Sequence, residues 1–251
     1  MAAIISLHSF RGGTGKSNLT ANLAATFALQ GRRVGIVDAD IQSPGIHVLF
    51  GLDEQQVDHA LNDYLHGACP IEQTAHDVTP PGVAQRGGSI QLIPSSIKTG
   101  EIARVLREGY DVALLHDGFT QLIRALKLDI LLIDTHPGLN EETLLAIAIS
   151  DLLLVVLRPD RQDFQGTAVI VEVARQLDVP RMYLVMNKVL ASMDGAALRE
   201  QAERTYNAPV AGLFPLSEEI FELGSAGIFC LLHPDRPWSE HLRQLAARVE
   251  A

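Results

Sequence analysis

The chain has 251 residues, a length that suits one large α/β domain. Nearly half of the residues are apolar (47%) and 20% are charged, which is the balance of a soluble globular protein. The formal net charge of −10 argues against a protein that coats nucleic acid with its whole surface, although it leaves room for one local basic patch. No apolar run approaches the roughly 18 residues that a membrane span needs.

Residues 1–7 are apolar and uncharged, and a glycine-rich segment follows them directly. We therefore interpret them as a first strand and not as a signal peptide, which would open with positive charge. The two cysteines, Cys69 and Cys230, lie far apart and match no metal or redox spacing. We expect both to be reduced, structural thiols of a cytoplasmic protein.

Short apolar runs alternate with helical patterns along the whole chain. An apolar face with a repeat near 3.6 residues predicts helices at 16–29, across 57–65 and across 238–249. Several of the short runs are apolar at nearly every position, as expected in a parallel sheet that is covered on both faces. The predicted strands are 3–8, 34–37, 90–93, 130–133, 152–157, 182–186 and 210–214.

This alternation predicts an α/β fold: one doubly wound domain over residues 1–251, with a mostly parallel sheet and helices on both of its faces. We find no domain boundary, internal repeat or low-complexity segment. The one irregular stretch, 67–89, contains Pro80-Pro81-Gly82 and Gly87-Gly88. We expect a long surface loop there, with or without a short hairpin.

A phosphate-binding loop is predicted between the first strand and the first helix, at Phe10-Arg11-Gly12-Gly13-Thr14-Gly15-Lys16-Ser17. Glycines allow a tight turn that aims backbone N–H groups at phosphate oxygens, and the helix adds the positive end of its dipole. Lys16 can reach the β- and γ-phosphates, and the Ser17 hydroxyl can ligate Mg²⁺. We therefore predict a site for ATP and Mg²⁺, with nucleotide contacts from Gly12, Gly13, Thr14, Gly15, Lys16, Ser17 and Asn18.

The pattern G-x-x-x-x-G-K-[ST] is not fully met, because Phe10 stands at its first glycine. The segment instead resembles the deviant Walker A box of the ParA/MinD family of ATPases, in which a signature lysine precedes Gly-Gly-x-Gly-Lys-[Ser/Thr]. The resemblance continues in the family's order over nearly the whole chain, and it implies a P-loop NTPase fold. Residues 38–44 resemble the family's switch I, and residues 129–138 resemble its Walker B strand and switch II. Asn187-Lys188 resembles the base-binding motif, and residues 214–217 resemble the loop over the adenine.

The main departure from the family is Arg11, which stands where the family has its signature lysine. In the family, that lysine crosses a dimer interface to the nucleotide phosphates of the partner. Arginine keeps the charge but is longer and planar. We hypothesise that Arg11 is a catalytic charge clamp that acts in trans; the alternative is an arginine that lies along the local surface. Arg158 and Arg161 are further candidates for a trans cation.

The resemblance also assigns roles to carboxylates in the switch segments. It implies that Asp40 orients the attacking water, that Asp134 holds Mg²⁺ through water, and that Asp38 supports the metal site from behind. Asp134 ends an apolar strand, so it lies at the sheet edge where ligands bind. The alternative for Asp38 and Asp40 is capping of a turn, which aspartate favours. His136 in switch II is a candidate sensor of the γ-phosphate or an ordinary loop histidine.

The base-binding side of the site is also implied by the resemblance. Asn187 offers a carbonyl and an amide to the edge of an adenine. Pro215 and Ser217 belong to the loop that covers the base in the family. Leu190 stands where the guanine-reading pattern Asn-Lys-x-Asp has its aspartate, which favours ATP over GTP.

By resemblance, we predict a slow, partner-stimulated ATPase in which ATP closes a sandwich homodimer and hydrolysis opens it. We predict that this dimer binds DNA non-specifically and positions a chromosome, plasmid or protein cargo in the bacterial cytoplasm, on the nucleoid. Candidate DNA contacts are basic residues of the C-terminal half: Arg175, Arg181, Lys188, Arg199, Arg204 and Arg243. The alternative is a set of solvated arginines interleaved with Glu200 and Glu203.

Three other functions remain open. A membrane-cycling ATPase of the MinD type would need a basic amphipathic tail; the last helix has mixed charge, so we expect core packing there and no membrane partner. A metal-cluster carrier of the Mrp type is suggested by residues 38–44 followed by Gly45-Ile46-His47, but the paired cysteines of a bridging cluster are missing. A regulatory protein with little hydrolysis is the third.

Overall fold

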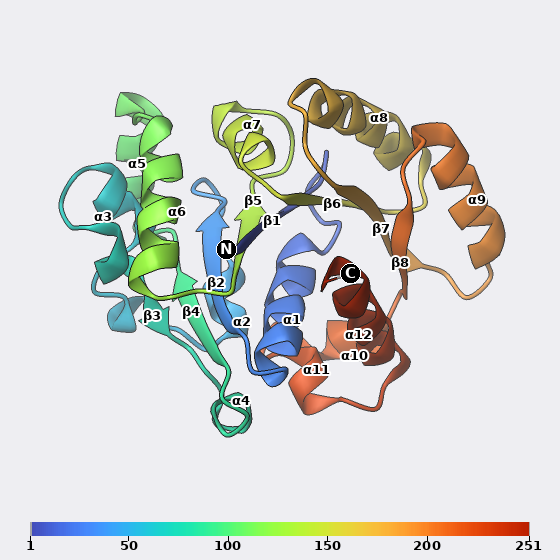
Figure 1. The fold of residues 1–251 in the computed structure, drawn as a ribbon, viewed down its shortest axis with the longest axis horizontal. Coiled ribbons are helices and arrows are strands. Elements are labelled where there is room, and N and C mark those ends of the chain that lie inside the picture. The colour runs from blue at the N-terminus through green and yellow to red at the C-terminus, as the bar shows by residue number, and fades with distance from the viewer. Residues whose placement is uncertain (1, 251) are drawn as a thin grey trace.

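The computed structural model describes residues 2–250 (Figure 1). Every predicted strand is present, and most extend by one to three residues beyond the prediction. The strands are β1 (Ala3–His8), β2 (Arg33–Ala39), β3 (His76–Asp77), β4 (Ser89–Ile93), β5 (Ile130–Thr135), β6 (Leu152–Leu157), β7 (Met182–Val189) and β8 (Val210–Pro215).

The helices lie between the strands and after the last one. They are α1 (Lys16–Leu29), α2 (Ile46–Leu49), α3 (Leu61–Leu65), α4 (Pro81–Ala84), α5 (Thr99–Glu108), α6 (Ala113–Ala125), α7 (Glu141–Ala148), α8 (Arg161–Gln176), α9 (Gly195–Tyr206), α10 (Glu218–Leu223), α11 (Phe229–Leu232) and α12 (Pro237–Glu250), with 3₁₀ turns η1 (Glu54–Gln56) and η2 (Ile71–Thr74).

The predicted helix across 57–65 is shorter than expected. It begins only at Leu61, because the backbone of Ala60 is extended (φ −108°, ψ 170°). The Asp63 carboxylate accepts the N–H of Ala60 at 2.8 Å, which caps the helix at that point. Val57 therefore lies before the helix and not on its apolar face.

One eight-stranded sheet runs through the molecule in the order β3-β4-β2-β5-β1-β6-β7-β8. All neighbouring strands are parallel except β3, which pairs antiparallel with β4. β1 lies between β5 and β6, and Leu7 and Asp38 are both register partners of Asp134. The carboxyl ends of β1, β2 and β5 therefore meet at one edge, and the predicted doubly wound sheet is confirmed. That residues 1–251 form a single domain stays a prediction.

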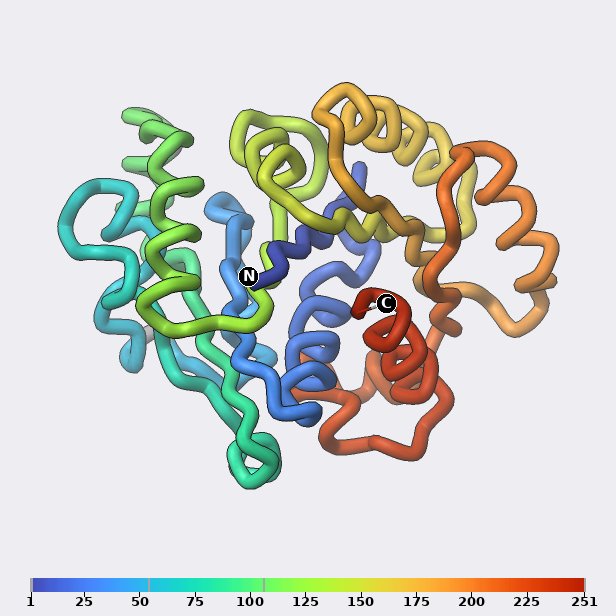
Figure 2. Tube along the Cα trace, in the orientation of Figure 1, coloured from blue at the N-terminus to red at the C-terminus, as the bar shows by residue number. Residues whose placement is uncertain are grey.

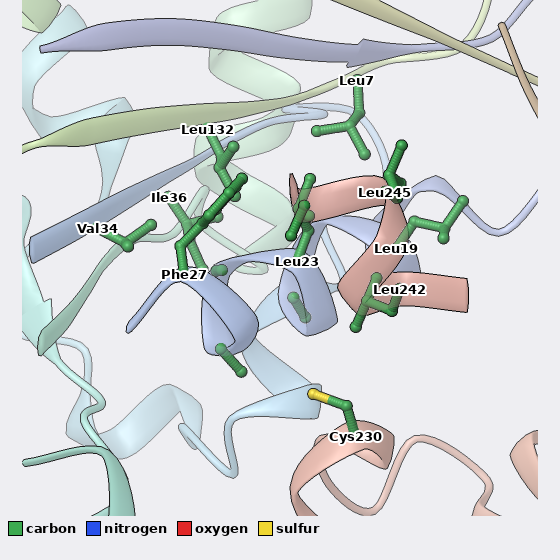
Figure 3. Packing of buried hydrophobic residues seen from close by; sticks show 14 of the residues in the cluster. Leu7, Leu19, Leu23, Phe27, Val34, Ile36, Leu132, Cys230, Leu242 and Leu245 are labelled. Atoms are coloured by element: carbon green, nitrogen blue, oxygen red, sulfur yellow. The ribbon is translucent and has the colours of Figure 1, made fainter. Parts of the chain in front are cut away.

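Helices cover both faces of the sheet (Figures 1 and 2). One face carries α1, α2, α11 and α12; the other carries α3 and α5 to α9. α1 is buried along most of its length, because the sheet covers one side and α12 covers another. Figure 3 shows Leu23 and Phe27 of α1 below Ile36 and Leu132 of the sheet, with Leu242 of α12 beside them.

The irregular segment 67–89 contains η2, the short strand β3 and α4. β3 pairs antiparallel with β4 in a short hairpin, one of the two arrangements expected for this segment, and β3 is the edge strand of the sheet. Gly88 passes very close to the C-terminal end of α1: a Cβ there would lie 1.9 Å from the carbonyl oxygen of Ala28. Gly88 is therefore explained by a close backbone approach, and Gly87 by its left-handed backbone (φ 79°).

Candidate nucleotide-binding site

The loop between β1 and α1 has the backbone of a phosphate-binding loop. Gly13 (φ 77°) and Gly15 (φ 93°) both adopt the left-handed region, which favours glycine. A Cβ on Gly15 would lie only 2.4 Å from Nδ2 of Asn187. Glycine at 15 is thus required by both its conformation and its neighbour, and α1 begins directly after it at Lys16.

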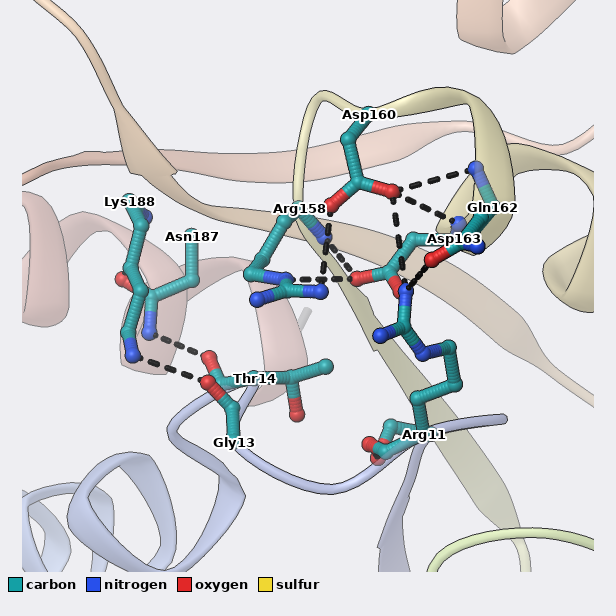
Figure 4. Close-up of polar contacts among 10 residues, drawn as sticks. Arg11, Gly13, Thr14, Arg158, Asp160, Gln162, Asp163, Asn187 and Lys188 are labelled. Atoms are coloured by element: carbon teal, nitrogen blue, oxygen red, sulfur yellow. Dashed lines mark hydrogen bonds and ion pairs between the residues drawn. The ribbon is translucent and has the colours of Figure 1, made fainter.

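The end of β7 holds this loop in place (Figure 4). Nδ2 of Asn187 donates to the carbonyl of Thr14 at 2.8 Å, and Nζ of Lys188 donates to the carbonyl of Gly13 at 2.8 Å. Oδ1 of Asn187 accepts the N–H of Lys188 at 2.9 Å, and Lys188 itself is left-handed (φ 60°). The side chain of Asn187 therefore shapes the loop, and the predicted contact with adenine stays a prediction.

Two buried carboxylates face this loop from neighbouring strands. Asp38 and Asp134 are the penultimate residues of β2 and β5, and they lie directly opposite each other in register. Burial raises the pKa of both carboxyl groups, and the charge of Asp134 raises that of Asp38 further, whereas Lys16 opposes the rise at Asp134. Burial without a counter-ion disfavours the ionised form of each carboxyl group, and a bound cation would stabilise that form. The pair therefore fits Mg²⁺.

Contacts from α1 and from switch I orient these carboxylates. The Thr20 hydroxyl donates to Oδ1 of Asp134 at 3.2 Å. Asp38 accepts the N–H groups of Asp40 and Gly45, each at 3.1 Å. The turn-capping role considered for Asp38 is thus present in the structure, together with its position behind the candidate metal site.

Asp40 lies in the loop after β2, where its Oδ1 accepts the N–H of Ser43 at 3.0 Å. Nε2 of His136 is 3.9 Å from the same oxygen. Burial raises the pKa of Asp40, and the nearby His136 and Lys16 oppose the rise. The two switch segments therefore meet at the Asp40–His136 pair.

Arg11 points toward α8 of its own chain (Figure 4). Nη1 is 2.5 Å from Oε1 of Gln162, 3.6 Å from Asp163 and 4.0 Å from Asp160. Arg158 binds the same two aspartates, each at 3.1 Å. Arg11 thus takes the local position that was the alternative to a trans clamp, and its action in trans stays a prediction.

A cavity of about 240 Å³ continues from the loop toward the C-terminal helices. It brings together the predicted residues Asn18, Asn187, Pro215 and Ser217. Its full lining is Gly15, Asn18, Asn187, Lys188, Pro215, Leu216, Ser217, Ile220, Phe221, Gly224, Ser225 and Trp238. Phe221 and Trp238 were missed from the sequence, because α10 has no clear pattern of its own and the apolar face of α12 indicated core packing alone.

The match to a protein family decides which family the chain belongs to. The family model of ParA, described as "NUBPL iron-transfer P-loop NTPase", matches residues 1–250. The chain belongs to this ParA family of P-loop NTPases. The resemblance inferred from the loop and switch motifs is therefore confirmed.

Two curated relatives of this ParA-family chain align over nearly its whole length. An uncharacterised ATP-binding protein of Methanocaldococcus jannaschii is 28% identical over 99% of this chain and 88% of its own. An iron-sulfur cluster carrier protein of Pyrococcus horikoshii is 27% identical over 98% of this chain and 84% of its own. Among solved structures, the cell division ATPase MinD of Pyrococcus furiosus matches with a TM-score of 0.84 at 23% identity, covering 100% and 99% of the two chains.

The predicted function of a DNA-binding positioning ATPase is wrong. The family model is one of iron transfer, and relatives are named as iron-sulfur cluster carriers or assembly factors. The structure gives a physical reason why the basic residues misled: their side chains bind acceptors of this chain. Three arginines donate to backbone carbonyls: Arg175 to Tyr206 and Asn207, Arg181 to Val249, and Arg199 to Val210. Lys188 donates to the P-loop carbonyl of Gly13. Arg204 forms an ion pair with Glu200, and Arg243 forms one with Glu240.

These comparisons do not support the alternative of a membrane-cycling ATPase of the MinD type. The MinD structures are less than 25% identical to this chain, so they show the fold alone. Six residues of α12 are buried, as core packing required: Trp238, Ser239, Leu242, Leu245, Ala246 and Val249. Of the helices in residues 2–250, none combines the length and apolar character needed to span a bilayer.

The cysteines do not form a cluster site. Cys69 lies between α3 and η2, whose Leu65 and Ile71 pack with α6 on one face of the sheet. Cys230 lies in α11 and packs in the core of the opposite face. Burial raises the pKa of the Cys230 thiol to about 11, and its Sγ is 3.5 Å from the carbonyl of Asn22. In the described part of the chain, no three His, Cys, Asp or Glu side chains converge as metal ligands. Two single thiols on opposite faces do not fit a thiolate-bound cluster within one subunit.

Proposed function

We propose that this chain binds ATP with Mg²⁺ and hydrolyses it slowly, as a switch that controls a partner protein in iron or iron–sulfur cluster transfer. The observation that carries the proposal is the meeting of Lys16 with the buried Asp38–Asp134 pair at one sheet edge. Phosphoryl transfer depends mainly on positioning and charge neutralisation. These three residues supply both.

Each predicted residue has a role that its position supports. The N–H groups of Gly12 to Gly15 and the start of α1 would cradle the phosphates, and the Lys16 ammonium would bind the β- and γ-phosphate oxygens. The Ser17 hydroxyl and Asp134 would hold Mg²⁺, with Asp38 behind them and Asp40 near the open side. When bound, Mg²⁺ supplies positive charge that neutralises the phosphate oxygens.

Asp40 would orient the attacking water, because it is the carboxylate of the switch segments that is only partly buried. Arg11 would act on the nucleotide of a second subunit in a homodimer, once its contacts with Asp163 and Gln162 open. The adenine would enter the cavity between Asn187, Pro215 and Phe221, where Ser217 and Asn18 are also present.

The description of the family and the names of the carrier relatives support a role in iron transfer. The positions of the two cysteines restrict which step of the transfer this chain can perform. Because Cys69 and Cys230 lie on opposite faces, we propose that a partner protein in the cytoplasm holds the iron or cluster as cargo. The nucleotide state of this chain would then set its affinity for that partner. This differs from a carrier that binds the cluster between its own paired cysteines.

The nucleotide part of the proposal is tested by ATP binding and hydrolysis in purified variants. Lys16→Ala is expected to weaken ATP binding about tenfold or more, and Asp40→Ala to slow hydrolysis about tenfold with binding nearly unchanged. Lys98→Ala, at the exposed N-cap of α5, is the matched control. Wild-type hydrolysis by Lys16→Ala would contradict the proposal.

The cargo part is tested separately by anaerobic incubation with ferrous iron and sulfide, followed by desalting. The chain alone is expected to retain no visible cluster absorbance and no stoichiometric iron. A stable cluster that survives desalting, and that Cys69→Ser or Cys230→Ser abolishes, would show that the chain carries the cargo itself.

A further inference from the structure

The backbone of Arg11 is fixed, whereas its side chain crosses to α8 with much of its surface in solvent (Figure 4). The buried hydroxyl of Ser9 donates to the carbonyl of Arg11 at 2.8 Å, which holds the main chain of the P-loop at this point. The guanidinium reaches α8, where Nη1 donates to Oε1 of Gln162, yet the side chain is 40% exposed. A rotation of the side chain alone would therefore release Arg11 from α8.

The two aspartates at the start of α8 are largely satisfied without Arg11. Oδ1 of Asp160 accepts the N–H groups of Gln162 and Asp163, at 3.1 and 3.0 Å, and so caps the helix. Oδ2 of Asp160 pairs with Nη2 of Arg158 at 3.1 Å. Oδ2 of Asp163 accepts the backbone N–H and Nε of Arg158, at 2.9 and 3.1 Å. Arg158 therefore keeps the start of the helix intact when Arg11 leaves.

One carboxylate oxygen of this cluster is left for Arg11. Asp163 is only 2% exposed, and its Oδ1 accepts no hydrogen bond from the described residues. Nη1 of Arg11 lies 3.6 Å from that oxygen. A buried carboxylate oxygen without a partner is costly, so it attracts a neighbouring cation. The attraction to Asp163 and the hydrogen bond to Gln162 together hold Arg11 on its own subunit.

This position of Arg11 competes with any role on a second subunit, because one guanidinium cannot occupy both places. We propose that the start of α8 is a latch, in which Gln162 and Asp163 hold Arg11 in cis until the phosphates of a second subunit's nucleotide compete for it. ATP carries one more phosphate group than ADP, so it competes better. Gln162 and Asp163 are positioning residues, since they act only through Arg11. The inference rests on the trans contact of the proposed function.

The latch predicts opposite effects of two substitutions at the exposed Gln162. Gln162→Ala removes the hydrogen bond to Arg11, so the ATP-bound dimer should form at about two- to fivefold lower protein concentration. Gln162→Glu places a charged acceptor beside the guanidinium and should raise that concentration about two- to fivefold. Sedimentation with Mg²⁺ and ATP measures both, in an Asp40→Ala background that slows hydrolysis. Gln165→Ala, at another exposed glutamine of α8, is the matched control and should dimerise like its parent.

Arg11→Ala separates the latch from other effects of these substitutions. It should weaken the dimer, and adding Gln162→Ala to it should change nothing further, because the latch acts through Arg11. The latch would be overturned by a Gln162→Ala protein that dimerises like Gln165→Ala, or by a Gln162→Glu protein that dimerises as well as its parent. Unchanged dimerisation of Arg11→Ala would overturn it too.

A readout in the nucleotide-free protein tests the contact itself. In ¹³C,¹⁵N-labelled wild type, the held guanidinium of Arg11 should rotate slowly and give separate Nη1 and Nη2 resonances, which should merge in Gln162→Ala. Merged resonances in wild type would also overturn the latch. A wild type that binds no ATP would instead count against the proposed function, and the resonances would still decide whether Gln162 holds Arg11.

Discussion

Phe10 replaces the first glycine of the usual P-loop pattern, and Gly166 of α8 is the residue that makes room for it. A Cβ on Gly166 would lie 2.1 Å from Cδ1 and 2.7 Å from Cβ of Phe10. Gly166→Ala therefore forces the ring and the start of the P-loop to move. Overpacking of this kind costs about 1–3 kcal/mol. For a chain of this size, about 2–4 °C of Tm per kcal/mol gives a loss of roughly 2–12 °C.

The assay is thermal unfolding with and without Mg²⁺ and ATP, because a displaced Phe10 should also weaken nucleotide binding. Gly195→Ala is the control: its added Cβ would meet its nearest neighbour at 3.8 Å, an ordinary contact. Phe10→Ala combined with Gly166→Ala should recover most of the lost Tm, since the ring is then absent. A Gly166→Ala protein as stable as Gly195→Ala, or a double variant no better than the single one, would show that Gly166 does not make room for Phe10.

Three further predictions concern single residues of the site. Asn187→Ala leaves the Thr14 carbonyl and the Lys188 N–H without their partner, so calorimetry should show a lower Tm, at about 1–3 kcal/mol per unpaired group, and weaker ATP binding. Burial lowers the pKa of His8 in the folded state to about 3, below its usual 6.5, so the folded state binds fewer protons than the unfolded state. The free energy of unfolding is therefore highest above pH 6.5, and it falls as pH drops toward 3, by up to about 1.4 kcal/mol per pH unit. Urea unfolding at pH 7 and pH 5 should show this loss in wild type and less of it in His8→Asn. Phe221 is 77% exposed at the rim of the base cavity, so Phe221→Ala should weaken ATP binding in titration calorimetry without lowering the Tm of the free protein.

The sheet could be predicted because its strands are short, apolar on both faces and separated by clear turns. The apolar runs predicted seven of the strands. Asp38 and Asp134 come directly after two of these runs, which predicted the edge of the sheet where a ligand would bind. The two-residue strand β3 gave no such run, since His76 and Asp77 are polar and lie at the sheet edge. Element ends were also set by local contacts, such as the Asp63 cap of α3, that periodicity does not detect.

Contacts between distant segments could not be predicted. Arg11 is bound by residues about 150 positions later, at the start of α8, and its charge alone gave no sign of that partner. The same limit explains the incorrect DNA-binding prediction, because counting arginines ignores the carbonyls and carboxylates that already bind them. The sequence did hold one signal for the cluster-carrier branch, the resemblance of 38–47 to a carrier's switch I. The missing cysteine pair outweighed it.

The proposed ATP site requires Lys16, Asp38 and Asp134 to act together with Mg²⁺. Titration calorimetry of ATP into wild type and Asp134→Asn, each with Mg²⁺ and with EDTA, is the sharpest test of that site. We expect saturable binding to wild type that weakens markedly without Mg²⁺, and a much smaller effect of Mg²⁺ in Asp134→Asn. Equal binding in all four titrations, or no binding to wild type with Mg²⁺, would contradict it.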